Sequence, residues 1–539
     1  ASTQDKLEAN ARKHATVPMA DTATAPLLTN HRAKPGKAPS IDDTMENYMG
    51  TTGAAQLFKA VLLAFAWSFD AQQVFMSVFT DVEPLWHCTG AESACSPAAA
   101  SPCALPAGAW AWDRPAMTSV VSEWSLKCAV PALVSLPASS FFAGCLAGGF
   151  LLTTLADSLL GRRKMLLTSL VTMSVAGVLT AFSPNVWAYA VLRFVSGFGR
   201  SMVGTTAMVL STELVGKKWR DTVCMAGFFC FALGFVSLPA LAYTFRDASW
   251  RNMYLWTSVP SLCYSILVYF LVHESPRWLL VRGRKQDAME TLQQIASLNG
   301  NSITSSFSML HACTMQEDDD SVFAALHSIW ERPWALRRLA AIMTVSFGVG
   351  TVYYGMPNIV GNLGPNLYMS VMYNALAELP SSILSWLLMG RINRRSSVIA
   401  LTAVAGLCSL ACVVIPQGAG RMAAELLSFF ATCTTVNVIM MYSIELFPTS
   451  VRNSAVGLVR QALVLGGVAA PMLVALGRDK SFLSFGVFGL VIGCFGMFAA
   501  CLPETKGKGI SDTMDEEEEK DAAVATCTVD DMDSSSDLM

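Results

Sequence analysis

Charge is scarce in this chain. Only 14% of its 539 residues are Asp, Glu, Lys or Arg, whereas 53% are hydrophobic, and the mean hydropathy is +0.44. A soluble domain carries about 25% charged residues, so most of this chain is not expected to face water. The formal net charge of −3 offers no basic surface, and nucleic acid is therefore not an expected partner.

Signatures of catalysis and of metal binding are lacking as well. Histidine occurs only six times, with no metal-ligand spacing in any apolar run, and the glycines form no phosphate-binding pattern. We therefore expect neither an enzyme nor a site for a metal or another cofactor. Residues 1–55 hold no apolar stretch of the kind that marks a cleavable signal peptide.

Long apolar runs, by contrast, recur along most of the chain. A helix needs about 20 mostly apolar residues to cross a bilayer, and lipid leaves no partner for the edge of an open sheet. The sequence therefore predicts an all-α protein with twelve transmembrane helices in contact with the lipid bilayer. The predicted spans are 57–80, 130–156, 164–183, 186–211, 222–245, 252–272, 336–360, 366–389, 397–416, 422–443, 454–477 and 482–502.

Lys and Arg residues predict the orientation of these spans. With both termini in the cytoplasm, the inner segments hold 27 of the 37 Lys and Arg residues and the outer segments hold 7, which follows the positive-inside rule. The predicted parts are a cytoplasmic N-terminal segment (1–55), a six-helix bundle (56–272) with an outer loop (81–128), a cytoplasmic loop (273–335), a second six-helix bundle (336–502) and an acidic cytoplasmic tail (503–539). Within the cytoplasmic loop, 285–298 predicts an amphipathic surface helix, and the tail is predicted to be disordered.

Four cysteines lie in the outer loop: Cys88, Cys95, Cys103 and Cys128. Cysteines on an oxidising side of a membrane form disulfides, and four cysteines allow three different pairings. We expect a disulfide-tied outer cap, and four free thiols in a Pro- and Ala-rich loop are the alternative. The chain contains no Asn-x-Ser/Thr acceptor, so N-glycosylation of the loop is not expected.

The few charged residues recur at a fixed distance. The pair Arg162-Arg163 lies 232 positions before Arg394-Arg395, and the same offset joins Glu213 to Glu445. Arg220 and Arg452 share this offset, and an offset of 230 joins Glu274 to Glu504. A long period of this kind indicates an internal duplication. In a membrane protein, two such parallel halves are typical of a transporter with its binding site between them.

The loops that hold these charges carry specific motifs. Gly161-Arg162-Arg163-Lys164 follows the second span, Glu274-Ser275-Pro276-Arg277-Trp278-Leu279 follows the sixth, and Pro503-Glu504-Thr505-Lys506-Gly507 follows the twelfth. On these motifs the membrane region resembles the major facilitator superfamily. The long outer loop, which ends in Val121-Ser122-Glu123-Trp124-Ser125-Leu126-Lys127-Cys128, resembles that of the organic cation/anion/carnitine transporter family. The turn over 156–163 is most similar to the plant branch of that family.

The resemblance implies a gate at the inner helix ends, where arginines and carboxylates pair across helix ends and between the halves. Exposed pairs are worth about 0–1 kcal/mol each, which suits a latch that opens repeatedly. The alternative is that the arginines only set the topology. Two departures weaken the match, because Asp157 lacks the arginine that usually follows it and the turn 390–395 lacks its usual acid. The predicted gating residues are Asp157, Arg162, Arg163, Glu213, Arg220, Glu274, Arg277, Arg391, Arg394, Arg395, Glu445, Arg452 and Glu504.

Ionisable residues inside the spans are candidates for function, because a charge in a bilayer is costly. Glu378 in the eighth span matches a carboxylate that is tied to substrate binding in the family's cation-handling members, and Tyr353 and Tyr354 resemble the family's aromatic patch. A carboxylate and aromatic faces suit a quaternary ammonium through cation–π attraction. The alternatives are a carboxylate paired with a helix-end donor and tyrosines at a lipid interface. Pro380 predicts a local break in this span.

Asp70 and Arg460 complete the predicted binding site. In the family, one position of the eleventh span holds an acid in cation transporters and a base in anion transporters. Here that position is Val464, with Arg460 one turn earlier on the same face. Asp70 and Glu378 on one side and Arg460 on another would suit a zwitterion such as carnitine. Asp70 is also a candidate proton carrier, and the alternative is that it pairs with Arg460 or Arg193 and only holds helices together.

The sequence thus predicts a monomeric transporter of small organic cations or zwitterions that works by alternating access, with a proton or sodium ion as a candidate coupling partner. A sugar or organic anion transporter of the same superfamily and a non-transporting receptor on this fold are the alternatives. Against a sugar porter stand the 48-residue outer loop and the lack of a Gln-x-x-Ser-Gly-x-Asn run in the seventh span. We expect the plasma membrane, with the vacuolar membrane as the alternative because Pro26-Leu27-Leu28 resembles a dileucine sorting signal.

Overall fold

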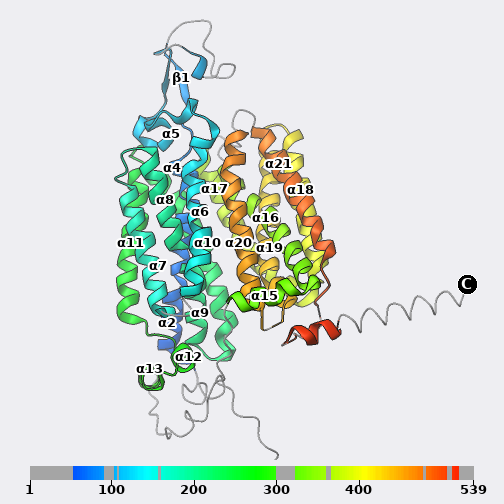
Figure 1. Cartoon of the computed structure of the whole chain (residues 1–539). Helices are drawn as coiled ribbons and strands as arrows, with labels where there is room; N and C mark the ends of the chain where they lie inside the picture. The colour runs from blue at the N-terminus through cyan, green and yellow to red at the C-terminus, as the bar shows by residue number, and fades with distance from the viewer. Residues whose placement is uncertain are drawn as a thin grey trace, which may run out of the picture.

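The computed structural model folds the chain into two helical bundles that stand side by side (Figure 1). A two-stranded ribbon projects from one end of the first bundle, and short helices lie at the opposite end. We call these the ribbon end and the α12 end. The structure describes residues 52–89, 102–105, 108–155, 160–298, 322–359, 366–448, 450–477, 481–506, 511 and 513–520.

The first bundle contains the first six predicted spans. Its helices are α2 (Ala54–Ala64), α3 (Ala66–Phe75), α4 (Ser77–Thr80), α6 (Pro131–Leu155), α7 (Arg162–Thr180), α8 (Val186–Arg200), α9 (Val203–Glu213), α10 (Arg220–Thr244) and α11 (Arg251–Leu271), with the 3-10 turn η5 (Lys217–Trp219) before α10. α2, α3 and α4 together form the first span, and α8 and α9 form the fourth.

The second bundle contains the other six spans. Its helices are α16 (Pro333–Ile359), α17 (Leu367–Arg391), α18 (Arg394–Val414), α19 (Ala419–Leu446), α20 (Arg452–Leu476), α21 (Ser481–Gly496) and the 3-10 turn η7 (Met497–Cys501). The prediction of twelve helices is confirmed, with ends that differ by at most three residues. Among the described residues, nine of these segments are long and apolar enough to cross a membrane by length and composition alone. The other three spans are α7, α8 with α9, and α17.

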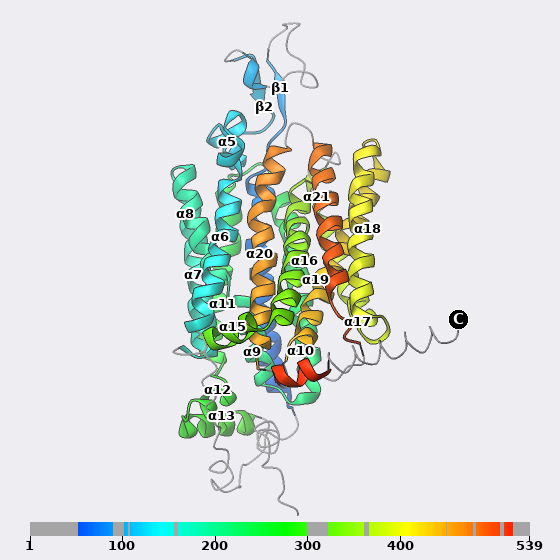
Figure 2. The same ribbon diagram turned by 45° about the vertical axis from the view of Figure 1, so that its right-hand side comes forward.

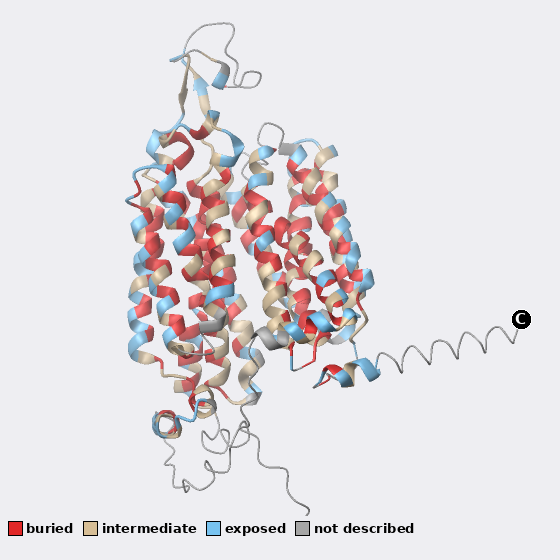
Figure 3. Cartoon of the chain, in the orientation of Figure 1, coloured by how far each residue is buried: buried red, intermediate tan, exposed pale blue. Residues whose placement is uncertain are grey.

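The outside of the two bundles is apolar. Large hydrophobic side chains are exposed there, such as Phe270 (74%), Phe182 (71%) and Leu407 (67%), whereas buried residues follow the inner faces of the helices (Figure 3). An apolar surface of this extent needs an apolar environment. The chain is therefore an integral membrane protein with several spans.

The duplication extends to one close helix crossing in each half. Gly234 of α10 lies against α3, where an added Cβ would come within 2.2 Å of the carbonyl oxygen of Ser68. Gly466 of α20, 232 positions later, lies against α16 in the same way. A Cβ added there would come within 2.4 Å of the carbonyl oxygen of Phe347. Small residues let transmembrane helices approach to backbone contact. In each half, a glycine of the fifth span therefore lets that span touch the backbone of the first.

A disulfide-bonded cap covers the ribbon end of the first bundle. Strand β1 (Trp86–Cys88) pairs antiparallel with β2 (Trp110–Trp112). The segments η1 (Pro102–Ala104), η2 (Ala116–Thr118), α5 (Val120–Glu123) and η3 (Leu126–Cys128) complete the cap. Cys103 is bonded to Cys128 with a Cα–Cα distance of 5.5 Å, and Cys88 is disulfide-bonded as well, while Cys95 lies outside the described residues. The first bond ties the cap to the residues that lead into α6.

Three helices at the α12 end belong to the chain between the bundles. These are α12 (Pro276–Val281), α13 (Lys285–Leu298) and α15 (Val322–Glu331). The predicted surface helix is confirmed as α13. The acidic run 317–320 lies outside the described residues.

Two expectations from the sequence were wrong. α17 runs through Pro380 without a break, since a transmembrane helix tolerates a proline when the surrounding protein accommodates it; just past the proline, the hydroxyls of Ser381 and Ser382 donate to the carbonyl oxygen of Glu378. The tail is also not disordered throughout, because residues 514–520 form a helix. Met514 in this helix is only 5% exposed and belongs to the large hydrophobic cluster that extends over both bundles.

Candidate functional site

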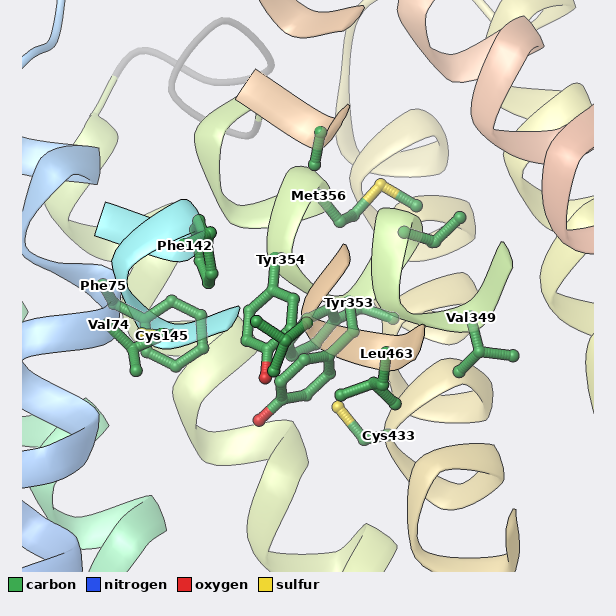
Figure 4. Packing of buried hydrophobic residues seen from close by; sticks show 14 of the residues in the cluster. Val74, Phe75, Phe142, Cys145, Val349, Tyr353, Tyr354, Met356, Cys433 and Leu463 are labelled. Atoms are coloured by element: carbon green, nitrogen blue, oxygen red, sulfur yellow. The ribbon is translucent and has the colours of Figure 1, made fainter. Parts of the chain in front are cut away.

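Five aromatic rings meet where the two bundles face each other. Phe75 comes from α3 and Phe142 from α6, whereas Tyr353 and Tyr354 come from α16 and Phe429 from α19. The centroid of the Tyr353 ring lies 6.1 Å from that of Phe75, 6.0 Å from Phe429 and 5.0 Å from Tyr354, and the Tyr354 ring lies 4.6 Å from Phe142. Figure 4 shows four of these side chains together. We call the five residues the aromatic cluster, and both halves contribute to it.

Glu378 of α17 is the carboxylate beside the aromatic cluster. Its side chain is buried, with 9% exposed, and the hydroxyl of Tyr353 donates to its Oε1 at 2.7 Å. Its Oε2 has no hydrogen-bond partner among the described residues. Ring faces and a carboxylate oxygen with spare acceptor capacity attract an organic ammonium. The sequence-predicted residues Glu378, Tyr353 and Tyr354 therefore lie together.

Asp70 of α3 is paired with Arg200, the last residue of α8. Arg200 Nε donates to Asp70 Oδ1 at 2.7 Å, and Nη2 donates to Oδ2 at 2.8 Å. The side chain of Arg200 is 6% exposed, and that of Asp70 is 1% exposed. The sequence-based alternative partners, Arg193 and Arg460, were wrong. Arg193 lies instead over the ring of Phe141, with 4.2 Å from its Cζ to the ring centroid, and Arg200 occupies both carboxylate oxygens.

Arg460 of α20 lies close to this ion pair. The charges of Asp70 and Arg200 and the hydroxyl of Tyr354 are its main electrostatic neighbours, and Tyr354 in turn lies in the field of both arginines. One carboxylate therefore faces two guanidinium groups, which leaves one positive charge in excess. Arg460 makes no hydrogen bond within the described residues, and it is only partly buried.

The carboxylate of Glu378 lies on one side of the neighbouring tyrosines, and the two guanidinium groups lie on the other. Tyr353 bonds to Glu378, and the adjacent Tyr354 lies near Arg200 and Arg460. The site therefore has a negative side and a positive side with aromatic rings between them. A molecule with an ammonium at one end and a carboxylate at the other matches this order of charges.

Two other buried charges in the spans have local partners. Arg193 is fully buried and donates to the carbonyl oxygen of Gln73 from both terminal nitrogens at 3.4 Å. Glu425 of α19 is 1% exposed and accepts a hydrogen bond from Asn374 Nδ2 at 3.0 Å. These contacts join helices within one half. No group of three or more His, Cys, Asp or Glu in the described part of the chain could hold a metal ion.

The two halves touch at the ribbon end through Tyr368 of α17. Its hydroxyl accepts a hydrogen bond from Arg114 Nη1 at 2.9 Å. Its ring is stacked parallel to Phe79 of α4 at 6.2 Å and meets Tyr243 of α10 edge-on at 5.7 Å. These three contacts link α17 to the cap and to two helices of the first bundle. The described structure therefore has its halves in direct contact at the ribbon end.

At the α12 end, the repeated glutamates cap helices. Glu274 Oε1 accepts the backbone N–H of Arg163 at 2.9 Å, at the start of α7. Glu504 accepts the backbone N–H groups of Arg394 and Arg395 at 2.7 and 3.2 Å, at the start of α18. A carboxylate is favourable there because the first N–H groups of a helix lack partners inside the helix. The duplicated motif thus builds the same cap in both halves.

Several other predicted gating residues make contacts within their own halves. Glu445 pairs with Arg394, with 3.1 Å between Oε1 and Nη2. Glu213 accepts a hydrogen bond from Ser275 and lies near Arg162, Arg277 and Glu274. In the second half, Arg452 Nε donates to the carbonyl oxygen of Phe447 at 3.3 Å, and the carbonyl oxygen of Arg391 accepts from Lys506 Nζ at 2.7 Å. Arg220 begins α10, and Asp157 lies outside the described residues.

Sequence reasoning assigned no role to four residues of the site. Arg200 is a charge inside a span, and its spacing of seven from Arg193 places both on one face of α8. Phe75, Phe142 and Phe429 are single aromatic residues in apolar runs, where phenylalanine is common. Only the packing of four different helices reveals that these rings surround Tyr353 and Tyr354.

Comparisons with known proteins agree with this architecture. The model of the sugar (and other) transporter family matches residues 90–515. Organic cation/carnitine transporter 2 of Arabidopsis thaliana is 49% identical over 516 residues, which cover 92% of this chain and 97% of that protein. Organic cation/carnitine transporter 3 of the same plant is 50% identical over 518 residues, which cover 94% of this chain and 99% of that protein. Solute carrier family 22 member 3 of Rattus norvegicus is 31% identical over 441 residues, with 80% and 78% covered.

Solved structures share the fold. The inward-open xylose transporter XylE from E. coli superimposes with a TM-score of 0.58 at 16% identity and covers 84% of this chain and 96% of its own. The same proton:xylose symporter, bound to 6-bromo-6-deoxy-D-glucose, gives 0.59 at 18% identity, with 86% and 98% covered. Two six-helix halves around a central site are the architecture of major facilitator transporters. The chain therefore belongs to the sugar (and other) transporter family of the major facilitator superfamily and, within it, to the organic cation/carnitine transporters.

Proposed function

We propose that this protein carries small organic cations or zwitterions, of the chemical kind of carnitine, across a membrane by alternating access. The observation that carries the proposal is the buried carboxylate of Glu378, which has one oxygen without a partner and lies against the aromatic cluster. An ammonium group satisfies the charge of this carboxylate and the ring faces at the same time. The names of the similar plant transporters agree with this chemistry.

The positive side of the site extends the proposal to zwitterions. Arg460 and Arg200 outnumber the single carboxylate of Asp70, so a substrate carboxylate is attracted to that side. The ammonium end lies toward Glu378, and Tyr353 and Tyr354 pack along the body of the substrate. A substrate with both charges thus spans the contact between the halves.

The proposed orientation places the α12 end in the cytoplasm. The disulfide Cys103–Cys128 supports this, because disulfides persist on an oxidising side of a membrane. The excess of Lys and Arg in the segments at the α12 end agrees. In this orientation the described state is closed toward the outside by Tyr368, Phe79 and Arg114. Rocking of one half against the other breaks these contacts and exposes the site to the outside.

Transport by purified protein in liposomes tests the proposal. Labelled carnitine, tetraethylammonium, nicotinate and glucose are offered in parallel, with empty liposomes as the background. We expect uptake of carnitine and tetraethylammonium only. Uptake of glucose alone would assign a sugar porter, and uptake of nicotinate alone an organic anion transporter. Binding of carnitine without uptake of any substrate would assign a receptor.

Two variants connect the transport to the site. Glu378→Gln keeps the shape of the side chain and removes its charge, so uptake of both cations should fall at least tenfold. Glu290→Gln on α13 removes an exposed carboxylate and should leave uptake unchanged. Full uptake by the Glu378→Gln protein would show that the substrate binds elsewhere.

The plasma membrane is the proposed location, and a proton or sodium ion is the proposed coupling partner. A fluorescent tag at the C-terminus, viewed in intact cells against markers of the plasma and vacuolar membranes, tests the location. Uptake with and without an imposed proton or sodium gradient tests the coupling. Rates that are the same in all gradients would identify a uniporter.

A further inference from the structure

A short acidic helix near the C-terminus is held against the second bundle. Residues 514–520 lie at the α12 end, in red in Figure 2. Arg332 pairs with two of its carboxylates, with 2.5 Å from Nη2 to Asp515 Oδ1 and 2.9 Å from Nη1 to Glu518 Oε2. Arg338 Nη1 lies 2.9 Å from Glu517 Oε1. We call residues 511 and 513–520 the clasp.

Burial distinguishes the clasp from a solvated acidic tail. Met514 is 5% exposed and packs into the core. The side chains of Arg338 and Glu517 are 8% and 20% exposed, so their ion pair is screened less than a surface pair. An apolar anchor and three ion pairs therefore hold this segment in one place.

The clasp is attached where the chain between the bundles enters the second bundle. Arg332 lies between the last residue of α15, Glu331, and the first residue of α16, Pro333. Arg338 lies on α16 itself, about 22 Å along the helix from Tyr353 at 1.5 Å per residue. The clasp thus binds both the residue that joins α15 to α16 and the helix that carries the two site tyrosines. The chain from the first bundle enters the second bundle at this point, and the inhibition proposed below is that a segment docked here opposes the movement of the halves.

Ser511 lies at the centre of the clasp. It is 2% exposed. Its hydroxyl donates to Glu517 Oε2 at 2.6 Å, and Lys520 Nζ donates to Ser511 Oγ at 2.9 Å. A phosphoryl group on this oxygen carries about −1.5 to −2 charges and would lie directly against the Glu517 carboxylate. Lys520 offsets part of that charge, but the repulsion from Glu517 and the burial of Ser511 disfavour the docked clasp once the phosphoryl group is present.

We propose that the clasp is an inhibitory contact within the protein and that phosphorylation of Ser511 keeps it undocked. The acidic residues that follow Ser511, Asp512 and Asp515 to Glu519, suit a protein kinase with a basic peptide site. The reaction transfers the γ-phosphoryl group of ATP to Ser511 Oγ. The bond between the γ-phosphorus and the bridging oxygen breaks, ADP leaves with the electron pair, and the hydroxyl proton passes to the kinase base. The docking of the clasp does not depend on the proposed function, whereas the inhibition rests on it.

Hydrogen exchange of the full-length protein in lipid nanodiscs tests the docking. The backbone amides of 517–520, which have acceptors within the helix, should be protected in the unmodified protein. Glu517→Gln removes the pair with Arg338, and Ser511→Glu adds charge beside Glu517, so both should raise the exchange rate of these amides at least tenfold. The matched controls are Glu519→Gln, which removes an exposed carboxylate of the same helix, and Ser511→Ala, which adds no charge. Both controls should keep most of the protection.

Transport and phosphorylation of the same proteins test the inhibition. The maximal uptake rate should rise at least twofold in Glu517→Gln and Ser511→Glu relative to Glu519→Gln. An acidophilic kinase with ATP should label Ser511 faster in Glu517→Gln than in the unmodified protein, because the hydroxyl is accessible only when the clasp is undocked. Unprotected amides in the unmodified protein would overturn the docking, and unchanged uptake despite lost protection would overturn the inhibition. Absence of all uptake would refute the proposed function, while the exchange rates would still decide the docking.

Discussion

Arg200 holds Asp70 at two points, with Nε 2.7 Å from Oδ1 and Nη2 2.8 Å from Oδ2. The pair joins α8 to α3 inside the first bundle, and neither side chain is more than 6% exposed. Removing one partner of such a pair leaves the other charge buried and uncompensated, whereas removing both does not. The pair is therefore expected to hold the helices as well as to shape the positive side of the site.

Asp70→Asn should destabilise the folded protein by about 3 kcal/mol, because Arg200 loses its counter-charge in a buried place. Thermal unfolding of the purified protein in detergent measures this loss. Asp247→Asn removes a carboxylate that is 70% exposed and should change stability by about 0.5 kcal/mol or less. The double variant Asp70→Asn/Arg200→Gln should be less destabilised than the two single losses added together. Strict additivity would show that the two residues do not stabilise the fold as a pair.

Tyr353→Phe should weaken substrate binding without unfolding the protein. The ring remains in the aromatic cluster, but the hydrogen bond to Glu378 Oε1 is lost. A hydrogen bond to a charged group contributes about 1.5–3 kcal/mol, so the KM for tetraethylammonium should rise by about tenfold or more. Tyr373→Phe, at a residue that is 41% exposed, serves as the control. An unchanged KM in Tyr353→Phe would show that the hydrogen bond between Tyr353 and Glu378 has no part in substrate recognition.

Arg460→Gln should distinguish zwitterions from plain cations. Uptake of carnitine should fall at least tenfold because its carboxylate loses a positive partner, while uptake of tetraethylammonium should be retained. Arg246→Gln, at a side chain that is 44% exposed, is the control for loss of a positive charge. Equal loss of both substrates would contradict a separate carboxylate side in the site.

Acid should destabilise the protein through His273, which follows α11 at the α12 end. Lys59 Nζ lies 2.9 Å from His273 Nδ1. Burial, and then the charges of Lys59 and Arg163, lower the pKa of His273 below its ordinary value of 6.5. The unfolded chain therefore binds the proton more tightly, so stability is lost as the pH falls through 6.5.

Melting temperatures at pH 7.5 and 5.5 measure this dependence. His273→Gln keeps a hydrogen-bond acceptor for Lys59 but cannot be protonated, so its melting temperature should fall less on acidification than that of the unmodified protein. His327→Gln, at a side chain that is 73% exposed, should behave like the unmodified protein. Identical pH dependence in His273→Gln and the unmodified protein would rule out this histidine as the source.

The spans were predictable because their apolar runs match the thickness of a bilayer. The helix propensity of single residues does not override this match. The partner of Asp70 was not predictable. Arg193 and Arg200 are seven residues apart on one face of α8, so periodicity cannot choose between them. The choice depends on Phe141, whose ring lies against the Arg193 guanidinium, and this residue belongs to another helix.

The clasp was missed for a similar reason. Its acidic composition is typical of a disordered tail, and composition ignores partners that lie far away in the sequence. Glu517 is 179 residues from Arg338, and only the folded second bundle brings them together. Likewise, Glu378 and the Tyr353-Tyr354 pair could be identified one by one, but the surrounding rings could not.

The caps made by Glu274 and Glu504 have a consequence for biogenesis. Each carboxylate closes the start of a helix that was synthesised 111 or 110 residues earlier. A ribosome that has made α7 must still deliver three more spans before that cap can form, and the same delay recurs for α18. Each half is therefore completed by its own last loop, and a stalled or truncated product that lacks this loop leaves an uncapped helix for quality-control machinery to detect.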